Sequence, residues 1–200
     1  MIMKDDDSLI NHETKRIFIA VNLDVSIKKE LSDIQQKITI GDSKIKWVYP
    51  ELMHITLEFL GNQLPKQIEI ICQILKKITG HCKSFVIDLS SSIGVFPSLK
   101  KPRVIWVGID KGSIELEMLS KLIKTDLQKK HLLSDNKEFR SHITIGRVKY
   151  LNNRNSLTDS IDHIVSKKIS QKVNSIELME SKLTPTGAIY REIFSFPLFD

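Results

Sequence analysis

The sequence predicts an α+β domain, and two observations carry that prediction. Helix and strand patterns are mixed along the chain, and most strand segments are short, with one apolar face and one polar face. Half-buried strands of this kind are typical of antiparallel or mixed sheets, whereas the strands of parallel sheets read as continuous apolar runs. No glycine-rich phosphate loop is present and the eight glycines are scattered, which disfavours a doubly wound nucleotide-binding sheet.

Three helices are predicted, each from one apolar stripe at helical spacing. The stripes are Ile27, Leu31, Ile34 and Ile38; Ile68, Ile71, Cys72, Leu75 and Ile78, ending near Gly80; and Leu116, Leu119, Ile123 and Leu127, within residues 114–130. Strands are predicted at 16–21, 44–49, 54–60, 85–89, 104–109, 142–148, 173–180 and 189–196. Gly61-Asn62 is expected to end a strand, Gly94-Val95-Phe96-Pro97 to mark a loop, and 151–172 carries no clear pattern.

Length and composition favour one soluble domain. The chain has 200 residues, which suits a flexible extension at 1–15 followed by a single domain at 16–200. The net charge of +6 favours an anionic partner, although lysines that merely solvate the surface explain it as well. No run of about 18 apolar residues and no secretory signal is present. Together with two cysteines expected to be plain thiols, this predicts a cytoplasmic protein without membrane partners.

A tetrapeptide that occurs twice is the strongest chemical signal. His54-Ile55-Thr56-Leu57 and His142-Ile143-Thr144-Ile145 both alternate a histidine and a threonine with two apolar residues. With 6 His and 9 Thr in the chain, two copies are expected about once in a thousand shuffles. The repeat therefore predicts function, whereas a single copy would predict only a strand.

Strand geometry predicts that the histidines and threonines of the two copies line one pocket. Residues two apart in a strand share a face, about 6.5 to 7 Å apart, so each imidazole projects beside a threonine hydroxyl while the apolar residues anchor the strand. Two imidazoles suit a phosphodiester, whose cleavage needs one group to take a proton and another to give one. Threonine hydroxyls can donate hydrogen bonds to phosphate oxygens. We therefore expect His54, Thr56, His142 and Thr144 to converge.

Two other chemistries are weaker readings of the same residues. His54, Glu58 and His142 could supply a metal ion with two nitrogens and a carboxylate, but the usual His-x-x-x-His spacing is missing. A serine hydrolase is disfavoured because no Gly-x-Ser-x-Gly elbow exists. The remaining histidines lack a threonine partner and are expected to be surface or core residues; they are His12, His81, His131 and His163.

The motifs resemble the two-histidine phosphoesterase superfamily, and within it the RNA 2′,3′-cyclic phosphodiesterases historically called 2′-5′ RNA ligases. Besides the two tetrapeptides, the matching segments are residues 16–20, 46–48, 50–51, 53–61, 94–97, 102–106, 139–147 and 180–181. The resemblance implies a bilobal α+β fold, with two antiparallel or mixed sheets flanking a central cleft and helices outside. It also implies that no metal or cofactor takes part in hydrolysing a terminal RNA 2′,3′-cyclic phosphate to a 2′-phosphomonoester.

The resemblance also implies roles. His54 would be the proton donor and His142 the proton acceptor, while Thr56 and Thr144 would hold the phosphate. The expected partners are RNA ends, tRNA fragments among them, bound by a monomer, with reversible 2′-5′ RNA ligation as a side activity. The alternative function is a noncatalytic RNA-end binding module with the same fold.

Side chains near the cleft are harder to place from sequence. Arg147 fits a family arginine that could contact phosphate, but strict alternation puts it on the face opposite Thr144, so it needs a bulge or a strand end to reach the pocket. Core packing or a solvated face is favoured over pocket lining for a further group, which comprises Lys46, Phe59, Phe96, Trp106 and Arg140.

Overall fold

A computed structural model describes residues 13–39, 41–133, 138–152, 154–185 and 187–200. Its strands are β1 (Lys15–Asn22), β2 (Lys44–Trp47), β3 (His54–Gln63), β4 (Phe85–Phe96), β5 (Val104–Ile109), β6 (His142–Tyr150), β7 (Ser170–Val173), β8 (Ser175–Thr184) and β9 (Gly187–Pro197). Its helices are α1 (Val25–Lys37), α2 (Pro65–Thr79), α3 (Ser113–Lys129) and α4 (Arg154–Asp162), with a 3₁₀ turn, η1, at Pro50–Leu52. The α+β class is confirmed.

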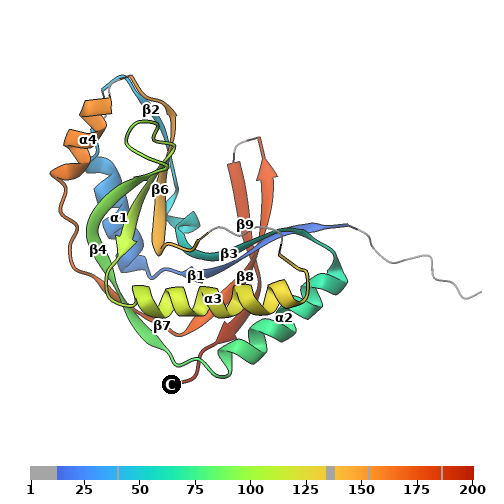
Figure 1. Ribbon diagram of the computed structural model, residues 1–200. Helices are drawn as coiled ribbons and strands as arrows, with labels where there is room; N and C mark the ends of the chain where they lie inside the picture. Colours follow the sequence, from blue (N-terminus) through green and yellow to red (C-terminus); the bar gives the residue numbers. More distant parts are fainter. Residues whose placement is uncertain (1–12, 40, 134–137, 153, 186) are drawn as a thin grey trace, which may run out of the picture.

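The strands form one curved antiparallel sheet in the order β7-β4-β5-β6-β3-β1-β8-β9, with β2 beside β6. Its two halves meet between β3 and β6, where one residue pair, Ile55 and Ile143, is in register. The two expected sheets are therefore joined, and the joint lies within the repeated motif. Figure 1 shows the β8–β9 hairpin and the β2–β6 strands rising on two sides of that joint.

The helices bury their predicted stripes against the convex sides of this sheet. Helices α2 and α3 pack together and contact β3, β8 and β9, whereas α1 contacts β6 and η1, and α4 contacts β4. Every apolar residue predicted for the three stripes is less than 10% exposed except Cys72, which is half-buried. Burial of these Ile and Leu side chains provides most of the stabilisation, at about 1.5–3 kcal/mol each.

Two glycine-containing segments were predicted wrongly as breaks. β3 continues through Gly61-Asn62 to Gln63, because Gly61 takes a left-handed φ of 67° that other residues rarely adopt. Gly94-Val95-Phe96 is the end of β4 and not a loop, because Gly94 lies opposite Trp106. A Cβ on Gly94 would sit 2.2 Å from the Trp106 ring, so this glycine permits close packing and no turn.

The largest gap in the prediction is at 151–172, which contains α4 and β7. Leu157, Ile161 and Ile164 are buried at a four-and-three spacing, but the polar residues between them obscure so short a stripe. The predicted strand at 173–180 starts at Ser175, after β7 has ended at Val173. At the other end, β1 begins at Lys15, inside the predicted extension, whose residues 1–12 lie outside the described part. Within the described residues no helix is long and apolar enough to span a membrane.

Candidate active site

The repeated motifs lie side by side at the joint of the two half-sheets. Because β3 and β6 run antiparallel with Ile55 opposite Ile143, the register brings His54 across from Thr144 and Thr56 across from His142. Both isoleucines are fully buried and anchor the strands. All four polar side chains line one pocket, so their expected convergence is confirmed.

Both imidazoles are held by the same backbone contact. His54 Nδ1 lies 2.8 Å from the carbonyl oxygen of Leu52, and His142 Nδ1 lies 2.7 Å from that of Arg140. A carbonyl only accepts hydrogen bonds, so Nδ1 carries the hydrogen in both rings. Each neutral ring therefore keeps Nε2 unprotonated, ready to exchange a proton with a ligand.

Aromatic rings surround each histidine from its own half of the sheet. His54 packs against Phe18 and Tyr190, with ring centroids 4.9 and 5.3 Å away. His142 packs edge to face against Phe96, with centroids 5.1 Å apart, and lies 6.3 Å from Trp106. These contacts fix the two rings and keep water away from them.

The same burial makes both imidazoles poor bases. Desolvation lowers the pKa of His54 to about 4, and the hydrogen bond to Leu52 only partly offsets it. Desolvation also lowers the pKa of His142, and the positive charge of Arg147 lowers it further. Both rings are therefore neutral at pH 7 until an anion compensates for the lost hydration.

Two β-bulges bring further side chains to the pocket. In the β5–β6 register Trp106 pairs with Thr144 and Ile105 pairs with Gly146, so Ile145 has no partner on β5. This extra residue reverses the alternation and places Arg147 on the pocket face. The bulge that Arg147 required is thus present, at the last position of the second tetrapeptide.

The first motif has the corresponding bulge at Leu57. Ile19 pairs with Glu58 and Ala20 pairs with Thr56, which leaves Leu57 unpaired, and Phe59 is then a pocket residue. Phe59 and Arg147 both follow their histidine by five positions. The two histidine motifs therefore share one backbone arrangement. The fifth residue after the histidine differs: it carries a phenyl ring in Phe59 and a guanidinium group in Arg147.

A helix side chain from the opposite half of the chain holds each bulge. Gln35 Nε2, on α1, donates to the carbonyl oxygens of Val48 and Ile145 at 2.8 and 2.7 Å. Ser120 Oγ, on α3, is buried and donates to the carbonyl oxygen of Leu57 at 2.9 Å. No motif in the sequence singles out Gln35 or Ser120, because their partners are backbone atoms far away in the chain.

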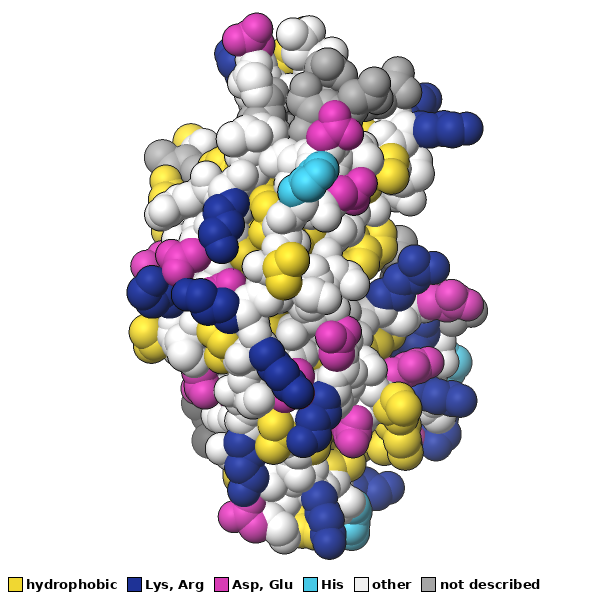
Figure 2. All heavy atoms as spheres, turned by 90° about the vertical axis from the view of Figure 1, so that its left-hand side faces the viewer, with side chains coloured by type: hydrophobic (Ala, Val, Ile, Leu, Met, Phe, Trp, Pro, Cys, Tyr) yellow, Lys and Arg dark blue, Asp and Glu magenta, His cyan; other side chains and the backbone are white. Residues whose placement is uncertain are grey.

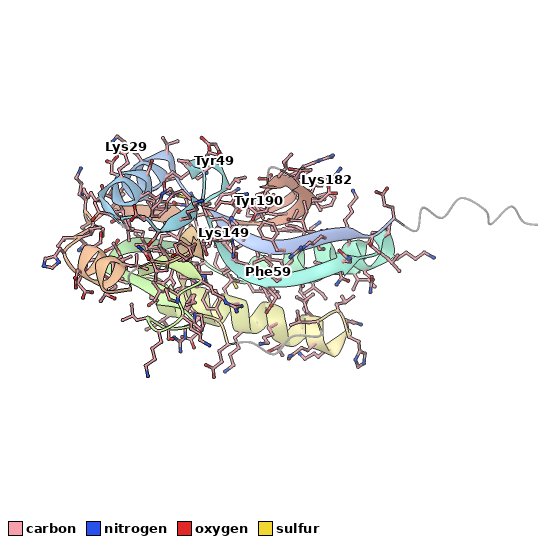
Figure 3. All side chains as sticks on the ribbon, turned by 90° about the horizontal axis from the view of Figure 1, so that it is seen from above. Lys29, Tyr49, Phe59, Lys149, Lys182 and Tyr190 are labelled. Carbon is pink, nitrogen blue, oxygen red and sulfur yellow. The ribbon has the colours of Figure 1, made fainter. Side chains whose placement is uncertain are left out.

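The pocket has a volume of about 1040 Å³. Besides the two histidines, two threonines and Arg147, its lining includes Lys46, Phe59 and Phe96, for which the sequence favoured packing or a solvated face. Trp106 and Arg140 are not in that lining. Figure 3 shows Tyr49, Tyr190, Lys149 and Phe59 gathered around the centre, with Lys29 on the outer edge. Tyr49, Tyr190 and Lys149 were missed because no motif contains them.

The alternative metal site does not assemble. Glu58 is outside the pocket lining, where its carboxylate accepts a hydrogen bond from the backbone of Phe59 at 3.1 Å. Among the described residues no three His, Cys, Asp or Glu side chains form a group that could hold a metal ion.

Comparison with known proteins identifies the family. The sequence model of LigT-like phosphoesterases matches residues 21–106. An RNA 2′,3′-cyclic phosphodiesterase of Archaeoglobus fulgidus is 34% identical over 90% of this chain and 99% of its own length. One from Aquifex aeolicus is 33% identical, covering 92% of this chain and 97% of the relative.

Solved structures show the same fold. TT0787 of Thermus thermophilus superposes with a TM-score of 0.78 at 22% identity, covering 92% of this chain and 97% of that one. E. coli LigT in its apo form gives 0.74 at 19% identity, covering 94% and 99%. With relatives above 30% identity over nearly their whole length, this chain belongs to the LigT-like phosphoesterase family of two-histidine enzymes.

Proposed function

We propose that this protein hydrolyses the 2′,3′-cyclic phosphate at an RNA 3′ end to a 2′-phosphomonoester, with His54 and His142 as its acid and base. The observation that carries the proposal is the pair of imidazoles across one antiparallel residue pair, each with its Nε2 left for the ligand. The relatives named RNA 2′,3′-cyclic phosphodiesterase support the substrate. E. coli LigT has also been solved with 3′-AMP, a nucleotide.

The proposed reaction is a single displacement at phosphorus. His142 Nε2 takes a proton from water as its oxygen attacks, the bond from phosphorus to the 3′ oxygen breaks, and His54 Nε2 gives its proton to that oxygen. The products are a 2′-phosphate and a 3′ hydroxyl. Thr56 and Thr144 donate hydrogen bonds to the non-bridging oxygens, and Arg147 balances their charge.

The charges in the pocket support the proposed roles of His142 as the base and His54 as the acid. Arg147 is the largest electrostatic influence on His142, where it favours the neutral ring that a base requires. His54 must carry a proton to act as the donor, yet burial lowers its pKa to about 4. Burial destabilises the protonated ring of His54, and the negative charge of the cyclic phosphate stabilises it. Substrate binding and protonation of His54 therefore occur together.

The proposed physiological ligands are RNA ends, tRNA fragments among them, acted on by a monomer in the cytoplasm. If the 5′ hydroxyl of a second RNA attacked in place of water, the same bond from phosphorus to the 3′ oxygen would break, His54 would again protonate that oxygen, and a 2′-5′ linkage would form. Water is far more abundant, so we assign hydrolysis as the main reaction.

The first test is turnover without metal. Purified protein is expected to open adenosine 2′,3′-cyclic phosphate at the same rate with and without excess EDTA, because the proposed acid, base and phosphate donors are all side chains. Chromatography of the nucleotide products measures the rate. Loss of turnover on chelation would contradict the metal-independent mechanism, and RNA-end binding without any turnover would support the noncatalytic alternative.

A second test addresses the bulge at Ile145. Gln35→Glu keeps the size of the side chain but replaces the amide donor with a carboxylate, which faces two carbonyl oxygens. The bulge is expected to shift, displacing His142 and Arg147, and kcat is expected to fall by about tenfold or more. Gln36→Glu, the exposed neighbour on α1, is the matched control. A wild-type kcat in a folded Gln35→Glu protein would contradict the proposed role of Gln35 in positioning the bulge.

A further inference from the structure

A second, smaller cavity opens beside the active-site pocket. It has a volume of about 310 Å³ and lies between the β4–β5 connection and the end of β6. Lys149 lines both cavities. Arg103 of the smaller cavity precedes Val104 of the pocket, and its carbonyl oxygen accepts a hydrogen bond from Val148 at 3.0 Å. The two hollows therefore form one continuous surface.

This surface is predominantly positive. The two linings together contain six lysines and arginines, namely Lys46, Lys100, Lys101, Arg103, Arg147 and Lys149, against one carboxylate, Glu51. The whole chain carries 30 such cations against 24 carboxylates. On the face in Figure 2, by contrast, cationic and anionic side chains are intermingled. The linings of the pocket and of the cavity beside it are thus strongly positive.

The cations of the smaller cavity are available to a ligand. Some exposed lysines elsewhere pair with carboxylates, as Lys29 does with Asp33 at 3.0 Å and Lys172 with Asp200 at 2.6 Å. Among the described residues no carboxylate forms an ion pair with Lys100, Lys101 or Arg103. Cations that repel one another without a protein counterion favour a polyanion.

An aromatic side chain completes this surface. Tyr150 follows Lys149 at the end of β6 and is 54% exposed. Exposed aromatic rings beside a basic groove are the usual platform on which proteins stack the bases of single-stranded nucleic acid. The opposite rim of the pocket, formed by the β8–β9 hairpin, instead exposes the apolar side chains of Leu183 and Ile189.

We propose that Lys100, Lys101, Arg103, Lys149 and Tyr150 bind the nucleotides that precede the terminal cyclic phosphate. This rests on the proposed function, because the end of the RNA must sit between His54 and His142. From there the strand leaves over the basic surface rather than past Leu183 and Ile189 on the hairpin. Lysine and arginine contact its phosphates, and the Tyr150 ring stacks on a base.

The test compares a long and a short substrate. Lys100→Gln with Lys101→Gln is expected to raise the KM for a six-nucleotide RNA ending in a 2′,3′-cyclic phosphate by about tenfold, leaving kcat unchanged. The slope of log KM against log salt is expected to fall by about 1.4, since each phosphate contact on a single strand contributes about 0.7. Turnover of adenosine 2′,3′-cyclic phosphate should stay at the wild-type value, because this substrate lacks the preceding nucleotides that Lys100 and Lys101 are proposed to contact.

Two controls make the result specific. Lys76→Gln with Lys77→Gln changes an equally charged exposed pair on α2, and should leave both substrates unaffected. Tyr150→Leu should raise the KM of the six-nucleotide RNA alone, by about tenfold. An unchanged KM for this RNA in both the Lys100, Lys101 and the Tyr150 variants would overturn the proposal.

Binding separates this inference from the proposed function. If the wild type turned over neither substrate, the proposed function would fail, and fluorescence anisotropy with a labelled six-nucleotide RNA would still measure the surface. Weaker RNA binding by the Lys100, Lys101 variant would support the surface, and equal binding would overturn it. Polyglutamate that competes as well as RNA at the same charge concentration would overturn the assignment to RNA.

Discussion

His54→Ala and His142→Ala are each expected to lower kcat for adenosine 2′,3′-cyclic phosphate by about 10³-fold or more, near the upper part of the range for general acid–base catalysis. Each substitution removes the Nε2 that exchanges a proton in the proposed reaction, and among the residues that the structure describes no other imidazole lines the pocket. The double variant should be only slightly slower than either single one, because a proton donor and acceptor act as a unit. Initial rates over a range of substrate concentrations measure kcat and KM.

The matched control for these variants is His81→Ala, which changes an exposed histidine outside the pocket. Its kcat should equal that of the wild type. Circular dichroism and thermal unfolding show whether each variant is folded, since His54 packs against buried Phe18. Comparable losses in all three variants, or a folded His142→Ala protein with wild-type kcat, would contradict the catalytic pair.

Arg147→Met is expected to have the second largest effect, a loss of about 10²-fold in kcat/KM. It removes the guanidinium group that the bulge at Ile145 brings to the pocket, and with it a charge-assisted contact to the phosphate. It also removes a positive charge that lowers the pKa of both histidines. Both values therefore rise, and the pH profile of kcat/KM should move to higher pH.

Arg147→Lys separates the two contributions of Arg147. A lysine keeps the positive charge, so the pH profile should stay near that of the wild type. The loss of the planar guanidinium group should still lower kcat/KM. Arg103→Met, an exposed arginine adjacent to the pocket, is the control and should leave turnover of the mononucleotide unchanged. A pH profile that does not move in Arg147→Met would show that Arg147 exerts no electrostatic effect on the pair.

The two histidine motifs follow one backbone plan, and the difference between them supports different roles in the proposed reaction. A histidine, a threonine, a bulge and a fifth residue occur in the same order on β3 and β6. The fifth residue is Phe59 on one strand and Arg147 on the other. Arg147 is the charge that lowers the pKa of His142, whereas its effect on the pKa of His54 is smaller than that of burial and of the charge on His142. The two identical side chains thus have different electrostatic surroundings, which is how proteins assign separate acid and base roles.

The sequence predicted the helices and the four-residue site because both depend on local periodicity. The buried stripes of α1, α2 and α3 and the alternation of His54, Thr56, His142 and Thr144 each follow from the residues of one segment. The bulges do not follow in this way. Whether Ile145 pairs or bulges depends on Gln35 and on the β5–β6 register, which are set by long-range contacts.

Other parts of the site could not be predicted from the sequence, for a related reason. Tyr190 reaches His54 because β9 pairs with β8, and β8 pairs with β1. That order of strands cannot be deduced from any single segment. Gly94 was predicted to lie in a loop because glycine usually interrupts a strand, whereas here its missing side chain makes room for Trp106.

The position of the phosphate in the product tests the central claim most directly, because it reports which bond breaks between the two imidazoles. Adenosine 2′,3′-cyclic phosphate is incubated with the wild-type protein in EDTA, and 2′-AMP and 3′-AMP are separated by chromatography. If His54 gives its proton to the 3′ oxygen, the product is 2′-AMP. Formation of 3′-AMP, of both isomers, or of no product would contradict the mechanism.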